Sequence, residues 1–143
     1  MGTNGLYVFK YNKKYYVFFK GNDSYPRGLG KEIIKELQNM SAEDVVILKY
    51  KILAININHK YTNSYCGYTS LMHSISNPHE YAFHISDSEP ETEIGLHYIY
   101  IIDMDKNVFV VKWCGETERH KVIFDLQSIP TEWVKLVETY DED

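Results

Sequence analysis

Residues 6–20 read LYVFKY-NKK-YYVFFK, two aromatic-rich runs on either side of a polar turn. In an extended chain successive side chains point to opposite sides, and here apolar side chains occupy both sides of each run. The pattern predicts strands at 6–11 and 15–20, paired as a hairpin through the turn at 12–14. Because both faces are apolar, we expect the hairpin to be covered on both sides or to lie centrally in a sheet.

Two helices are predicted after this hairpin. Apolar residues recur every three or four positions over 31–40, which indicates the first helix. Ser41-Ala-Glu-Asp44 approximates a capping box, because the Ser41 hydroxyl can accept a hydrogen bond from the Asp44 amide. The second helix should therefore run on to about residue 55; a strand at 45–48 is the alternative that the cap disfavours.

The last third of the chain repeats the strand–turn–strand pattern. Apolar runs at 96–103 and 108–113 flank the polar segment 103–107. A further strand is predicted at 121–126, and the segment from 129 opens a final helix.

The middle of the chain is polar and gives weaker signals, a short helix near 69–75 and a strand near 81–85. Residues 87–93 carry four acids and a proline, which predicts an exposed loop that self-repulsion keeps extended. Neither half of the chain has a convincing core alone. We therefore expect a single globular domain, 1–143, with a short acidic tail at 140–143.

The order of these elements predicts an α+β fold: a mainly antiparallel sheet built from two aromatic hairpins, with two central helices and a C-terminal helix packed on it. The chain holds 13 Tyr, 6 Phe and 2 Trp. Large aromatic side chains fill a core efficiently, and we expect Phe18 and Trp133 to be buried in it.

Charge and cysteine content narrow the class of protein. The formal net charge is −5, and arginine occurs only at positions 27 and 119. Nucleic acid is therefore disfavoured as a partner, since its recognition relies on clustered positive charge and bidentate Arg. No apolar run approaches the roughly 20 residues of a membrane span, so we expect no membrane association. We expect Cys66 and Cys114 to be free thiols, as is usual in a reducing compartment, and therefore expect an intracellular protein.

The segment DMDKN at 103–107 matches the opening of a calcium-binding loop. The match fails at the sixth position, where Val108 replaces the required Gly, and at the twelfth, where Cys114 replaces a bidentate Glu. A hairpin turn is predicted instead.

Cys66 and the histidines offer only weak signs of chemistry. A nucleophilic Cys66 would need a histidine base, and the candidates are His73, His84 and His97. Cys66, His73 and His79 could meet at a metal only if the polar middle folds back on itself. We therefore expect no metal and no cofactor.

The segment 22–30, NDSYPRGLG, gathers an acid, a hydroxyl pair, a cation and two glycines at the end of the first hairpin. Binding groups concentrate on loops held by rigid scaffolds, so we expect the functional surface here. The candidate binding residues are Asp23, Ser24, Tyr25, Arg27, Gly28 and Gly30.

Structural alternatives stay open for the same segment. Asp23 and Tyr25 can instead lock an Asx-type turn. Gly28 and Gly30 can either present amides to an anion at the helix start or permit a tight entry into the helix, and the second is favoured.

Both ends of the chain also carry a resemblance. MGTNGLY at 1–7 and DSYPRGLG at 23–30, with matching aromatic and apolar positions at 98–103, 109–111 and 129–133, resemble a family of short proteins from fungi and large DNA viruses. The family pattern is roughly MGTRG, an aromatic hairpin and DSYPxGLG, so Asn4 stands where the family has Arg. The family has no established activity, and the resemblance implies relatives and a viral source without a mechanism.

Two functions from different classes follow. The first is a non-catalytic binding or assembly module, virus-encoded and acting in the host cytoplasm or the virus particle, with a protein partner or a second copy of itself. The alternative is a small hydrolase, either N-terminal-nucleophile-like through Thr3 after removal of Met1 and Gly2, or cysteine-dependent through Cys66.

Overall fold

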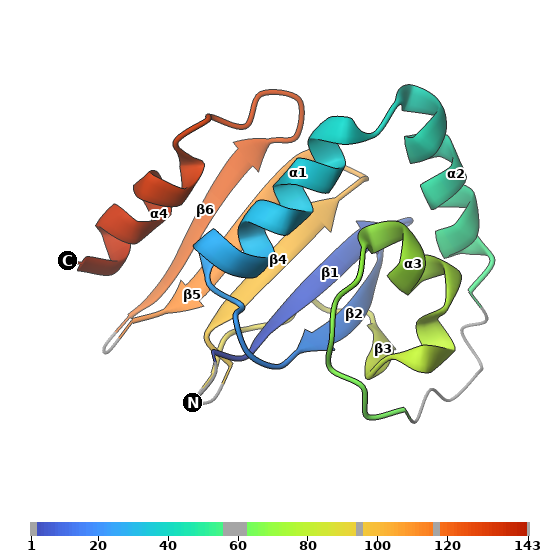
Figure 1. The fold of residues 1–143 in the computed structure, drawn as a ribbon, viewed down its shortest axis with the longest axis horizontal. Helices are drawn as coiled ribbons and strands as arrows, with labels where there is room; N and C mark the ends of the chain where they lie inside the picture. The colour runs from blue at the N-terminus through green and yellow to red at the C-terminus, as the bar shows by residue number, and fades with distance from the viewer. Residues whose placement is uncertain (1–2, 56–62, 94–95, 116–117, 143) are drawn as a thin grey trace.

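The computed structural model describes residues 3–55, 63–93, 96–115 and 118–142. Within these residues the chain forms one sheet, and Figure 1 shows the helices α1 to α4 on one of its faces. The elements in chain order are β1 (Gly5–Tyr11), β2 (Lys14–Lys20), the π-helical turn η1 (Pro26–Gly30), α1 (Lys31–Asn39), α2 (Ala42–Leu53), α3 (Leu71–Ser76), the 3-10 turn η2 (Pro78–Glu80), β3 (Phe83–Ser86), β4 (Tyr98–Asp103), β5 (Val108–Cys114), β6 (Arg119–Asp125) and α4 (Trp133–Glu142).

The strand order in the sheet is β3-β2-β1-β4-β5-β6. Every neighbouring pair is antiparallel except β1 and β4, which run parallel with Gly5 opposite Tyr98. The predicted α+β fold with a mainly antiparallel sheet is therefore confirmed. The sequence did not indicate the parallel pair, because it joins two hairpins through contacts between residues more than ninety positions apart.

Helix α2 confirms the capping box. The Asp44 amide donates to Ser41 Oγ at 3.1 Å, and the Ser41 amide donates to Asp44 Oδ2 at 3.0 Å. Helix α4 runs to Glu142, so the acidic tail predicted from residue 140 is helical backbone up to that residue. Among the described residues, no helix is long and apolar enough to cross a membrane.

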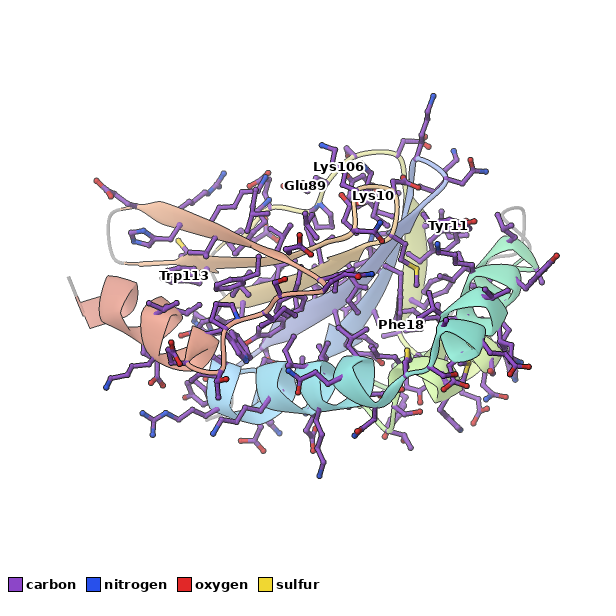
Figure 2. The ribbon with its side chains drawn as sticks, turned by 90° about the horizontal axis from the view of Figure 1, so that it is seen from above. Lys10, Tyr11, Phe18, Glu89, Lys106 and Trp113 are labelled. Carbon is purple, nitrogen blue, oxygen red and sulfur yellow. The ribbon has the colours of Figure 1, made fainter. Side chains whose placement is uncertain are left out.

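The two faces of the sheet carry different side chains. The face under the helices is rich in aromatic residues, among them Tyr7, Phe18 and Tyr100, and Trp133 of α4 packs against it. Figure 2 shows Phe18 between the sheet and the helices. Phe18 and Trp133 are both buried, as predicted. The opposite face is mainly aliphatic and is also buried; its members are Leu6, Val8, Tyr15, Val17, Ile99, Ile101 and Val110.

Residues 87–93, which we name the acidic strap, cross this second face. Lys112 of β5 has its ammonium within 2.8 Å of both Glu89 and Glu91, and it also donates to the Pro90 carbonyl at 2.7 Å. Thr92 is 1% exposed. The loop is exposed at Asp87, Ser88, Glu91 and Glu93, as predicted. The predicted self-repulsion is wrong, because lysines of the sheet form ion pairs with Asp87, Glu89 and Glu91. Figure 2 shows Glu89 on the side of the sheet away from the helices.

The turns of the two predicted hairpins are tied together. Asn12 and Lys13 have φ of 52° and 67°, as in a type I′ turn. Their amides donate to Asp105 Oδ1 and Oδ2 at 2.8 and 3.0 Å. Asp103 Oδ1 accepts from the amides of Asp105 and Lys106. The calcium-like segment is thus a hairpin turn, as predicted, and its carboxylates bind backbone amides.

Candidate functional site

The segment after β2 is held by hydrogen bonds to the residue Thr3, just before β1, and to Tyr100 of β4. Asn22 and Asp23 have φ of 61° and 53°, a conformation that turns the chain sharply. Ser24 is fully buried; its amide donates to the Thr3 carbonyl at 3.1 Å, and its own carbonyl accepts from the Tyr100 hydroxyl at 2.6 Å. Ser24 is therefore the residue that anchors the loop to the sheet.

Gly28 and Gly30 allow close approach of neighbouring atoms to the backbone of the loop. A Cβ on Gly28 would lie 2.5 Å from the Asp23 carbonyl oxygen, and one on Gly30 would lie 2.6 Å from Cη2 of Trp133. The amides of Gly28 and Gly30 both donate to the Tyr25 carbonyl, and the Leu29 amide donates to the Asp23 carbonyl. These three amides are used within the loop, which favours the steric explanation for both glycines over anion binding.

The rest of the loop borders an open hollow of about 640 Å³. Asp23, Tyr25, Arg27 and Gly28 line it, whereas the other two candidates, Ser24 and Gly30, are buried and do not. The hollow is completed by Lys20, Leu29, Glu32, Tyr68 and Glu138. The structure therefore brings four of the six predicted binding residues to one surface.

Two side chains stand out at this surface. The ring of Tyr25 is 49% exposed and meets the Tyr98 ring edge-on, with 6.2 Å between centroids. Arg27 forms a bidentate pair with Glu138 of α4, at 2.7 and 2.8 Å, and this pair lowers the pKa of the Glu138 carboxyl. The Lys20 ammonium donates to the carbonyls of Gly21 and Asn22, so it holds the start of the loop.

The far wall of the hollow is fixed by Glu36 of α1. Its carboxylate accepts from the Tyr68 hydroxyl at 2.7 Å and from the amides of Leu71 and Met72, the first residues of α3. Burial, together with the hydrogen bond and negative charge of Glu36, holds the pKa of the Tyr68 hydroxyl far above its ordinary value. Tyr68 is therefore a neutral, oriented hydroxyl, and α3 is anchored to α1.

Four of the residues that line the hollow lay outside the predicted segment: Lys20, Glu32, Tyr68 and Glu138. They come from β2, α1, the segment before α3, and α4. A sequence signal existed only for Lys20, which ends the first hairpin; the other three are brought in by tertiary packing.

The residues considered for catalysis lie elsewhere. Thr3 is 7% exposed. The thiol of exposed Cys66 donates to the Ser64 carbonyl at 3.4 Å, and His73 Nδ1 lies 2.5 Å from the Tyr81 hydroxyl. Within the described ranges, no group of three or more His, Cys, Asp or Glu side chains is placed to hold a metal ion.

Comparisons of this chain with models of protein families, with curated proteins and with solved structures find no match. The resemblance to the fungal and viral family stays a prediction.

Proposed function

We propose that the protein is a non-catalytic binding module that holds a protein partner at the hollow beside the 22–30 loop. The observation that carries the proposal is a half-exposed aromatic ring, Tyr25, beside an exposed guanidinium, Arg27, on a loop with a fixed backbone. Tyr and Arg are among the side chains most enriched at the energetic centres of protein interfaces.

The rigidity of the loop supports this function. Ser24 fixes one end of the loop, and the π-helical turn η1 leads directly into α1 at the other. Groups already held in place lose little conformational entropy on binding, so more of their contact energy appears as affinity.

The charges around the hollow favour a protein over a nucleic-acid partner. Lys20 and Arg27 lie with Asp23, Glu32 and Glu138 around the same surface. A mixed lining of this kind suits the polar rim of a protein interface, whereas a phosphate backbone needs a cluster of one sign. The resemblance to viral proteins supports a host protein or a particle component as the partner.

The test is photo-crosslinking followed by affinity measurement. A photoreactive phenylalanine analogue at position 25 should capture a partner, and the same analogue at Tyr65, which has nearly the same exposure (51%), should not. With that partner purified, Tyr25→Ala and Arg27→Ala should each weaken binding by about tenfold or more. Tyr65→Ala and Cys66→Ser should bind as the wild type does. No specific capture at position 25, or unchanged binding in both loop variants, would overturn the proposal.

A further inference from the structure

Helix α2 exposes an unusual concentration of large apolar side chains. Val46, Ile47, Tyr50 and Leu53 are 51%, 40%, 72% and 51% exposed, and we name them the α2 strip. The opposite side of the helix buries Leu48 and Ile52 in the core. A helix on the surface of a monomer normally turns a polar face outward, so an outer face this apolar is typical of an interaction surface.

The α2 strip is separate from the loop hollow. In the helical layer, α2 lies at the opposite end from α4 (Figure 1), and α4 supplies Glu138 to the hollow. A partner on the α2 strip would therefore not compete for the surface around Tyr25.

Two exposed charges flank Ile47, one member of the α2 strip, at equal distances along the chain. Glu43 and Lys51 stand four residues before and four residues after Ile47, so the three lie in one row along the helix. Within the described part of the chain, neither Glu43 nor Lys51 takes part in an ion pair. The order along the row is acid, apolar residue, base. Two such rows place opposite charges against each other only when the two helices run antiparallel.

We propose that a second copy of this chain docks on the α2 strip, with the two α2 helices antiparallel and the two-fold axis passing at Ile47. Glu43 then faces the partner's Lys51, and Lys51 faces the partner's Glu43, so one contact forms both ion pairs. A parallel pairing would set Glu43 against the partner's Glu43, and like charges oppose it. The exposed ring of Tyr50 is covered by the partner helix.

The size of the α2 strip sets the strength of this dimer. Stable interfaces bury roughly 800 Å² on each partner, more than one row of exposed side chains on a helix of three turns supplies. The dimer should therefore be weak, with dissociation constants on the order of 100 µM, and should matter where copies are concentrated.

Sedimentation velocity of the full chain, from about 5 to about 500 µM, tests the apolar contact. The wild type should shift from monomer to dimer across this range, and Tyr50→Lys should stay monomeric. Ile123→Lys is the matched control, because Ile123 is 57% exposed and is the one exposed large apolar side chain among the described residues of β6. A wild type that stays monomeric throughout, or a Tyr50→Lys variant that dimerises like the wild type, would overturn the proposal.

Charge exchange tests the antiparallel arrangement. Glu43→Lys and Lys51→Glu should each weaken self-association about five- to tenfold, since each replaces two attractive pairs by two repulsive ones. An equimolar mixture of the two variants should associate again, and so should the double variant. Singles that associate normally, or a mixture that stays monomeric, would rule out this geometry. Circular dichroism of each variant verifies that α2 still folds, and because the loop hollow is untouched, this result is independent of the partner bound there.

Discussion

The ammonium of Lys112 lies 2.8 Å from Glu89 Oε2, on the face of the sheet that the acidic strap covers. The Lys112 side chain is only 5% exposed, and its buried positive charge is compensated by ion pairs with the strap acids Glu89 and Glu91. Burial raises the pKa of the Glu89 carboxyl, but hydrogen bonds and positive charge from Lys112 and Lys121 outweigh burial and hold that pKa below its ordinary value.

The strap should therefore loosen in acid. A carboxyl with a lowered pKa in the folded state binds protons less readily than in the unfolded chain, so its stabilising effect is complete above its unfolded pKa and disappears as the pH falls through the folded one. Urea unfolding between about pH 6 and pH 3 should show a falling free energy of unfolding. Glu89→Gln should remove part of this slope.

Lys112→Met provides the control, because it removes the main cause of the lowered pKa of Glu89. It should flatten the same part of the pH profile, and the double variant should add nothing further. Independent, additive effects of the two changes would contradict the pairing.

Gly30 and Trp133 should be energetically coupled. The missing Cβ of Gly30 leaves room for Cη2 of Trp133, so Gly30→Ala should cost about 1–3 kcal/mol through overpacking. Trp133→Ala alone should cost about 3–5 kcal/mol. In the Trp133→Ala background the cost of Gly30→Ala should fall by more than half; equal costs in both backgrounds, measured by chemical denaturation, would disprove the coupling.

The Tyr100 hydroxyl should matter for stability through its buried hydrogen bond to the Ser24 carbonyl. Tyr100→Phe leaves the buried Ser24 carbonyl without that donor and should lower the free energy of unfolding by about 1–3 kcal/mol. Tyr25→Phe removes a hydroxyl from a half-exposed ring and should change stability by less than about 0.5 kcal/mol. Similar losses in both variants would show that the Ser24 anchor is unimportant.

Replacement of Lys13 by glycine should stabilise the protein. Its φ of 67° suits glycine, and the contact with Asp105 uses only the backbone amide. Lys13→Gly should raise the free energy of unfolding by about 0.5–1 kcal/mol, whereas Lys13→Val should lower it, since a β-branched residue is strained at positive φ. Thermal unfolding checks this: the melting temperature of Lys13→Gly should lie above that of the wild type and that of Lys13→Val below it. A destabilised Lys13→Gly would contradict the prediction.

The sequence predicted those elements that are specified by residues close to them in the chain. The hairpins follow from apolar runs on either side of a polar turn, and α2 follows from the Ser41 cap, because these signals lie within a few residues of the elements they specify. The parallel β1–β4 pair and the strap depend on contacts between distant segments. Four acids in seven residues predict mutual repulsion, and only the folded sheet places Lys112 beside Glu89 and Glu91.

The same limit applies to the candidate site. The loop could be located from its composition, and Tyr25 and Arg27 do reach a surface. Ser24 could not be recognised as an anchor, because its role depends on Tyr100, on a strand 76 positions away in sequence. Glu138 completes the surface only because α4 packs beside η1.

The late partner of β1 has a consequence for synthesis of the chain. The first hairpin leaves the ribosome with both faces apolar, yet β4, which covers the free edge of β1, is not made until residue 98. The lysines that fasten the strap, Lys112 and Lys121, are made later still. A nascent chain of fewer than about a hundred residues thus carries an open, hydrophobic strand edge that invites aggregation or chaperone capture.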